Sequence, residues 1–199
     1  MKKQNKEKTE KPKMHIASCS FGKDSIATIL LALKHGEPLD RVVFSEVMFD
    51  RERGISGEIP CHIEWIYGTA IPRLESMGVK VDVVRADKDY KSLMLGKKKN
   101  GTYYGHQYRN PCFANGELKL TPIKKYFSEL RKDFDVIQYV GIATDEPVRL
   151  ERLKKDNTKI SLLEKYGYSQ EDTMALCKQE DLLSPYYSSA YRGGVFLLS

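Results

Sequence analysis

The chain has 199 residues, of which 41% are hydrophobic and 30% are charged, and its formal net charge is +6. This composition is typical of a globular protein, and the length suffices for one α/β domain with a buried core. No apolar run reaches the roughly 18 residues that span a bilayer. The amino terminus is charged and lacks the apolar segment of a signal peptide. We therefore expect a cytoplasmic protein that does not enter a membrane.

Positive charge is concentrated at two places. Residues 1–13 contain six Lys and two Glu and little that could be buried, which predicts a disordered basic tail. The second cluster is Lys97 to Lys99. Both could contact nucleic acid or a phosphorylated substrate, although a solvated tail is the simpler interpretation of the first. The folded domain is expected over 14–184, with a carboxyl-terminal tail over 185–199.

Strand and helix patterns alternate along most of the chain. The alternation predicts an α/β fold with a doubly wound, mostly parallel sheet. Residues 96–111 show no clear period, and a loop of that length is usually functional or mobile. In chain order we expect a strand at 14–18, a helix at 24–35, a strand at 41–50, a helix at 60–77, a strand at 79–84, a short helix at 88–95, a helix at 118–130 interrupted near Pro122, a strand at 135–142, and helices at 146–154 and 170–178.

The segment Ser20 to Ser25, with the sequence SFGKDS, joins the first strand to the first helix. Backbone N–H groups at such a junction face an anion, so the segment predicts a phosphate cradle. Gly22 would allow a close approach, and Lys23 would add a point charge beside the serine hydroxyls. Asp24 would hold Mg²⁺ or cap the helix. The spacing differs from G-x-x-x-x-G-K-[ST], so this is not a Walker A loop.

A second polar segment, Gly141 to Arg149, follows the fourth expected strand. Ligands of parallel sheets bind beyond the carboxyl ends of the strands. Glu146 and Arg149 stand three residues apart and can pair on one helical face. A ligand cleft and an ordinary capped helix with a surface ion pair are equally good interpretations of this segment.

The four cysteines are Cys19, Cys61, Cys112 and Cys177. None belongs to a C-x-x-C pair, which excludes a zinc ribbon. Cys112 lies near several lysines, which lower a thiol pKa and make the thiol more nucleophilic, but a half-buried Cys beside a helix start is the simpler interpretation. Cys177 lies on an expected helix and is predicted to be in the core.

Taken together, three segments resemble the phosphoadenosine phosphosulfate reductase family of the adenine nucleotide α-hydrolase-like (PP-loop) superfamily. The first is SFGKDS, the second is C-x₆-K-x₂-P from Cys112 to Pro122, and the third is G-I-x₃-E-x₂-R from Gly141 to Arg149. The resemblance extends from about His15 to about Gln179. It implies a Rossmann-like three-layer fold and an adenine-nucleotide site.

The resemblance also implies roles for individual residues. The loop would hold phosphate or sulfate, the end of the second strand would border the adenosine, and the third segment would close the site opposite the loop. The implied nucleotide-binding residues are Ser18, Ser20, Phe21, Gly22, Lys23, Asp24, Ser25, Glu46, Met48, Gly141 and Arg149, and the implied catalytic residues are Lys23, Asp24, Cys112 and Glu146, with Asp24 as the metal ligand.

The favoured function is an enzyme that binds ATP and Mg²⁺ and cleaves between the α and β phosphates to adenylate an acceptor. The acceptor could be a tRNA or DNA base or a small metabolite. One alternative is a phosphoadenylyl-sulfate reductase-like enzyme, and another is an inactive nucleotide-binding or nucleic-acid-modification subunit. Residues 185–199 contain no cysteine that could attack sulfate sulfur. The four cysteines belong to separate expected elements, so no iron–sulfur cluster is expected.

Overall fold

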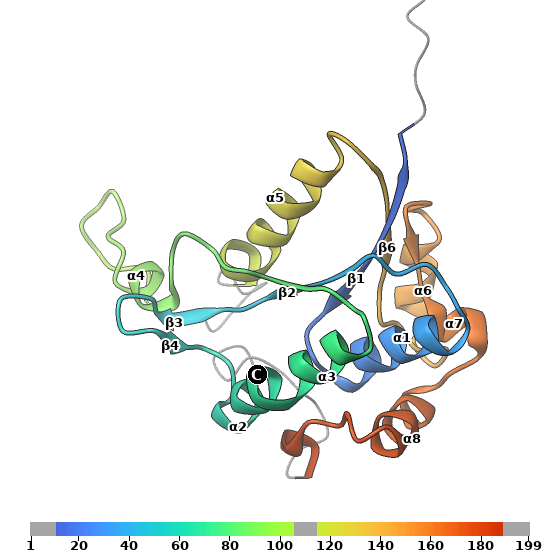
Figure 1. Ribbon diagram of the computed structural model, residues 1–199. Helices are drawn as coiled ribbons and strands as arrows, with labels where there is room; N and C mark the ends of the chain where they lie inside the picture. The colour runs from blue at the N-terminus through green and yellow to red at the C-terminus, as the bar shows by residue number, and fades with distance from the viewer. Residues whose placement is uncertain (1–10, 106–114, 189–199) are drawn as a thin grey trace, which may run out of the picture.

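The computed structural model describes residues 11–105 and 115–188 (Figure 1). Most of the predicted basic tail, the end of the predicted 96–111 loop with Cys112, and residues 189–199 lie outside the described residues.

A five-stranded parallel sheet forms the centre of the molecule, with the strand order β5-β2-β1-β6-β7. The first strand is central because β1 pairs with β2 on one side and with β6 on the other. The strand order therefore reverses next to β1, and this is where open parallel sheets form a ligand crevice. The strands are β1 Lys13–Cys19, β2 Arg41–Ser45, β5 Val81–Val84, β6 Asp135–Tyr139 and β7 Lys159–Ile160.

Helices cover both faces of the sheet, so the predicted three-layer α/β fold is confirmed (Figure 1). Below the sheet in this view lie α1 and α3, with α7 and α8 packed against α1, and above it lies α5. The helices are α1 Lys23–Lys34, α2 Pro60–Trp65, α3 Ile71–Ser76, α4 Tyr90–Met94, α5 Thr121–Leu130, α6 Pro147–Leu153, α7 Leu162–Tyr166 and α8 Gln170–Gln179.

The alternation of side chains along β1 divides the core between these two layers. Ala17 and Cys19 belong to the larger cluster, which contains the buried face of α1. Met14 and Ile16 point the other way and pack with Phe127 of α5. A strand that is buried on both faces has few polar positions, and Ser18 is the one hydroxyl side chain of β1, one residue before its carboxyl end.

The predicted strand 41–50 is two strands in the structure. The parallel strand β2 ends at Ser45, and Met48–Asp50 forms β3, which pairs antiparallel with β4 (Ile55–Ser56). Gly54 adopts φ +68° in the intervening turn, a conformation that glycine adopts without steric penalty. The prediction was wrong because β-favouring residues continue across a change of sheet.

The predicted helix 60–77 is present, but a π-helical segment, η1 Ile66–Ala70, separates α2 from α3. Pro72 follows this segment, and a proline inside a helix has no N–H to donate to the preceding turn. A second π segment, η2 Asn115–Leu120, precedes α5 near the predicted interruption at Pro122. The short elements β7 and α7 were not predicted, because two and five residues are too few to show a period.

Two predicted irregular segments begin with regular structure. The first part of 96–111 contains a bridge between Lys97 and Tyr103. The predicted tail 185–199 begins with a 3₁₀ turn, η3 Pro185–Ser188. Among the described residues, no helix has both the length and the apolar character that crossing a membrane requires.

Candidate nucleotide-binding site

The SFGKDS loop leaves the carboxyl end of the central strand β1 and enters α1. Phe21 has φ +57°, which costs a residue with a side chain about 1–2 kcal/mol. Its ring is 1% exposed and meets Phe44 edge-on at 5.1 Å between centroids. The ring is therefore an apolar anchor for the strained loop. Because the ring is buried, only the backbone of Phe21 could make the ligand contact that the sequence predicts for this residue.

The N-cap residue of α1 leaves the first turn of the helix without a local side-chain cap. Gly22 occupies this position and has no side chain to offer, and the Lys23 N–H of the first turn donates to the distant Tyr187 hydroxyl. The Ser25 hydroxyl instead holds the loop together, since it donates to the Gly22 carbonyl (2.9 Å) and accepts from the Ser20 N–H (3.3 Å). The first-turn amides of a helix have no partner within the helix. They carry a partial positive charge, as the predicted phosphate cradle requires.

Lys23 and Asp24 form a polar cluster with Thr173 of α8. The Lys23 Nζ lies 2.7 Å from Asp24 Oδ1 and 3.3 Å from Thr173 Oγ1, and the Thr173 hydroxyl donates to the same Asp24 oxygen at 2.8 Å. The Lys23 side chain is only 9% exposed. Asp24 therefore does not cap the helix, which was one of its two predicted roles. It orients the lysine.

Helix α8 holds this cluster at a second point. The Cys177 thiol, four residues after Thr173, donates to the Lys23 carbonyl oxygen at 3.2 Å. Burial raises the pKa of Cys177 to about 12 and that of Cys19, on β1, to about 11. Both are therefore structural thiols, and the predicted core position of Cys177 is confirmed.

Gly141 brings the end of β6 against the start of α1. A Cβ atom at this position would lie 2.7 Å from the Asp24 carbonyl carbon and 2.9 Å from the Ser25 nitrogen, so only glycine allows this approach. On the preceding strands, the Gln138 amide donates to the Ser18 hydroxyl at 2.7 Å. In the structure, Ser18 thus ties β1 to β6 beneath the loop.

Glu146 and Arg149 form the predicted i,i+3 pair. Arg149 Nη1 donates to Glu146 Oε1 at 2.6 Å, and the other carboxylate oxygen accepts from the Ala143 N–H at 3.3 Å. The cavity of about 860 Å³ beside Lys23 is lined by Asp145, by one side of α8 and by Tyr187. Asp145, and not its neighbour Glu146, therefore shares this cavity with Lys23.

Glu46 and Met48 line a separate cavity of about 550 Å³ at the end of β2. Glu46 is 3% exposed, and its Oε2 accepts from the Tyr67 hydroxyl (2.7 Å) and from Arg85 Nε (2.8 Å). Burial, and then Glu46, raise the pKa of Tyr67 to about 12. The phenol thus stays protonated, and the charge on this wall of the cavity is that of the Glu46–Arg85 ion pair.

The carboxyl-terminal part of the chain also contacts the loop. The Tyr187 hydroxyl accepts from the Lys23 N–H at 3.0 Å. Buried His62 of α2 lies with Nδ1 2.7 Å from the Ser184 hydroxyl and Nε2 3.4 Å from the Ser20 carbonyl. Burial is the main reason why the pKa of His62 lies below its ordinary value. A neutral imidazole can bridge a hydroxyl and a carbonyl in this way.

Glu58 is a buried carboxyl group at the entrance to α2. It is 6% exposed, and among the described residues its Oε1 has no hydrogen-bond partner. Burial raises its pKa, and the Lys119 charge acts in the opposite direction. The backbone carbonyl of Lys119 accepts a hydrogen bond from the hydroxyl of Ser45, the last residue of β2, at 3.1 Å. Lys119 of the C-x₆-K-x₂-P segment thus lies near the end of β2, while Cys112 lies outside the described residues.

Sequence reasoning missed several of these side chains. Thr173 and Cys177 stand four residues apart on α8 and therefore share one helical face. This spacing was the one sequence signal that could have placed both side chains against the loop. The others come from distant elements and share no local pattern. The missed residues are Glu58, His62, Tyr67, Arg85, Thr173, Ser184 and Tyr187.

No known family model and no curated protein matches the chain. Among solved structures, phosphoadenylyl-sulfate reductase from Candida auris, in complex with phosphate, superposes with a TM-score of 0.59. The identity is 9%, and the match covers 92% of this chain and 81% of that chain. The chain has the fold of phosphoadenylyl-sulfate reductase. At the level of the fold, the resemblance seen in the sequence is confirmed.

A second solved structure is the U34-tRNA thiolase NcsA from Methanococcus maripaludis with its [4Fe-4S] cluster. The TM-score is 0.45 at 16% identity, and the match covers 94% of this chain. The present chain spans 62% of that enzyme. In the fold shared with the reductase, the SFGKDS loop of this chain follows the central strand β1.

Replacing Gly141 with Ala should destabilise the protein, because the new methyl group meets the backbone of Asp24 and not a flexible side chain. Overpacking of this kind costs about 1–3 kcal/mol, which urea denaturation would measure. Gly68→Ala is the matched control, since nothing lies within 4 Å of a Cβ there. Equal stability of the two variants would contradict the close approach.

Glu58→Gln should gain stability relative to the natural protein as the pH rises. The pKa of Glu58 is raised in the folded state, so its contribution is complete below the unfolded pKa and is lost above the folded pKa. The difference in unfolding free energy should grow by about 1.4 kcal/mol for each unit of elevation. Urea denaturation at pH 4 and pH 8 would measure it, with exposed Glu52→Gln as the control. A difference in unfolding free energy that does not change with pH would contradict the raised pKa of Glu58 in the folded protein.

Proposed function

We propose that the protein binds ATP at the SFGKDS loop and transfers its adenylyl group to an acceptor with release of pyrophosphate. The observation that carries this proposal is the amino terminus of α1, whose N-cap residue Gly22 provides no side-chain cap, with the buried Lys23 amine held by Asp24 and Thr173. A helix terminus and a neighbouring ammonium group together favour the several negative charges of a triphosphate.

The rest of the nucleotide would extend along the carboxyl ends of the strands. The adenosine would occupy the cavity lined by Glu46, Met48 and Tyr67. The triphosphate would lie over the loop, within reach of the cavity beside Lys23 that Asp145 borders. Gly141 would contribute by its lack of a side chain, and Glu146 with Arg149 would form the opposite wall.

In the proposed step a nucleophilic atom of the acceptor attacks the α-phosphorus. The bond from this phosphorus to the oxygen that bridges to the β phosphate breaks, and pyrophosphate leaves with the electron pair. The acceptor loses its proton to solvent. Lys23 stabilises the charge that develops on the leaving pyrophosphate, because a preorganised donor interacts more strongly with the transition state than with the substrate.

Mg²⁺ fits this site only with the help of the nucleotide. Among the described residues, no group of three or more His, Cys, Asp or Glu side chains could hold a metal. Mg²⁺ is commonly bound through one or two carboxylates together with substrate phosphates, and Asp24 is the one carboxylate on the loop. When bound, the ion would neutralise charge on the phosphates.

The test is pyrophosphate release from ATP, assayed with Mg²⁺ and a panel of acceptors that includes tRNA, DNA and small thiols. Acceptor-dependent release would support adenylyl transfer. Nucleotide binding without release, for any acceptor, would favour the alternative of an inactive subunit.

A reductase-like activity is the second candidate, and the fold favours it. Of the described cysteines, Cys19 and Cys177 are buried with raised pKa values, and Cys61 is exposed. Cys112 lies outside the described residues. Sulfite release from phosphoadenylyl sulfate with thioredoxin as the reductant, compared between the natural protein and Cys112→Ser, would test this activity. Visible absorption after anaerobic purification would test the prediction that no iron–sulfur cluster is present.

Lys23→Ala should weaken ATP binding more than tenfold while the protein remains folded. A charge-assisted contact contributes on the order of 1.5–3 kcal/mol. Titration calorimetry with ATP and Mg²⁺ measures the effect. The control is Lys34→Ala, which removes the same charge at the exposed other end of α1. Unchanged affinity in folded Lys23→Ala would refute the assignment of the loop.

A further inference from the structure

Residues 96–105 form a small hairpin beyond α4, which we call the basic arm. Its two sides are joined by hydrogen bonds from the Lys98 N–H to the Thr102 carbonyl (2.7 Å) and from the Tyr104 N–H to the Gly96 carbonyl (2.9 Å). Gly101 turns the chain at the tip with φ +83°. The arm therefore has a defined shape, and it extends away from the rest of the molecule in Figure 1.

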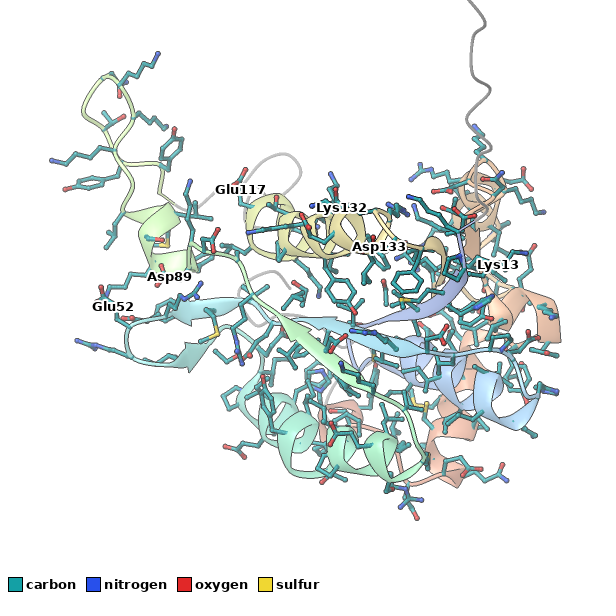
Figure 2. All side chains as sticks on the ribbon, turned by 45° about the horizontal axis from the view of Figure 1, so that its top comes forward. Lys13, Glu52, Asp89, Glu117, Lys132 and Asp133 are labelled. Atoms are coloured by element: carbon teal, nitrogen blue, oxygen red, sulfur yellow. The ribbon has the colours of Figure 1, made fainter. Side chains whose placement is uncertain are left out.

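The arm presents cations next to aromatic rings. Lys97 Nζ lies 5.7 Å from the centre of the Tyr103 ring, and Lys98 Nζ lies 5.6 Å from that of Tyr104. The two tyrosines are 56% and 49% exposed. Lys99 is exposed beside them. Figure 2 shows the side chains of this segment projecting outward on both sides of the turn.

The charge of the arm is unbalanced. Residues 90–105 contain four lysines and no acidic residue. Lys91, at the base, forms an ion pair with Asp50 at 2.7 Å. Among the described residues, Lys97, Lys98 and Lys99 form no ion pair within 4.0 Å. Three unneutralised ammonium groups on one short hairpin favour a polyanionic partner.

The base of the arm is joined firmly to the candidate site. Asp89 caps α4 and accepts from the Arg51 N–H at 2.8 Å, which ties α4 to the β3–β4 hairpin. Figure 2 labels Asp89 on α4 beside this hairpin. Met48, the first residue of β3, lines the cavity assigned to adenosine. The arm is thus connected, through α4 and the β3–β4 hairpin, to the cavity assigned to adenosine.

We infer that the basic arm binds single-stranded nucleic acid, with its lysines on the phosphates and its tyrosines stacked on bases. Alternation of cations and exposed aromatic rings is the chemistry of sequence-tolerant binding to single strands. The polar tip, Asn100 to Thr102, has no apolar side chain to insert into a bilayer, which argues against a membrane surface. The inference rests on the proposed function and narrows its acceptor to a nucleic acid.

The test is fluorescence anisotropy of the full chain with labelled 20-nucleotide single-stranded RNA, single-stranded DNA and duplex DNA, without ATP, over a range of salt concentrations. Removing three phosphate contacts from a single strand lowers the slope of log affinity against log salt by about 2. We expect this change, and at least tenfold weaker binding, for K97Q/K98Q/K99Q. The matched control K34Q/R152Q/K155Q removes three exposed cations, one from α1, one from α6 and one from the turn after α6, and should bind like the natural protein.

The tyrosines are tested separately. Y103A/Y104A should weaken binding to the single strands about tenfold or more, since stacking contributes about 1–3 kcal/mol per base, and should leave the salt slope unchanged. Y103F/Y104F should retain binding. A preference for RNA or for DNA would identify the kind of acceptor.

Three results would overturn the inference: no binding to any oligonucleotide, equal losses in the two triple variants, or binding to anionic phosphatidylserine vesicles without binding to the oligonucleotides. Titration with ATP separates this inference from the proposed function. K97Q/K98Q/K99Q should bind ATP normally, so a failure of the arm to bind nucleic acid would not contradict ATP binding at the loop. Likewise, the result for ATP binding in Lys23→Ala would not decide whether the arm binds nucleic acid.

Discussion

The contact between the end of β6 and the start of α1 is the constraint on which the candidate site depends. Gly141 lies so close to Asp24 and Ser25 that no side chain fits between the backbones. The loop is therefore supported by main-chain atoms on one side and by the Phe21 ring, buried against Phe44, on the other. Rigid support allows a short loop to keep its amides oriented with no ligand bound, because little ordering is left for the ligand to impose.

A second layer of support comes from parts of the chain that are remote in sequence. Thr173 and Cys177 of α8 contact Lys23 and Asp24 across about 150 residues, and His62 joins the loop carbonyl to Ser184. These contacts immobilise a lysine whose long side chain would otherwise sample many rotamers. The electrostatics of the loop thus depend on the packing of α8 against α1, one of the most extensive contacts between helices in the described structure.

The fold and the loop could be predicted because their signals are local. Alternating strand and helix patterns, and the SFGKDS segment placed between them, required only neighbouring residues. The prediction failed at 41–50, where β-favouring residues leave the main sheet at Glu46 and enter the β3–β4 hairpin. The places of Glu58, Tyr187 and Arg85 in the site could not be predicted. They depend on tertiary contacts between distant elements, and no local sequence pattern indicates such contacts. Asp24 had two predicted roles, and the geometry of Lys23 and Thr173 excludes the capping role.

The hydroxyl of Tyr187 acts as an internal ligand of the loop. It accepts a hydrogen bond from the Lys23 N–H, an amide of the kind that would donate to a phosphate oxygen, and it would also be the first neighbour of any Cβ at Gly22, at 3.3 Å. An anion bound as proposed would compete with this phenol for one donor. The apparent affinity for a nucleotide would then be the intrinsic affinity multiplied by the fraction of molecules in which the donor is released. Under the proposed function, the turn that carries Tyr187 would therefore set the nucleotide concentration at which the loop is occupied.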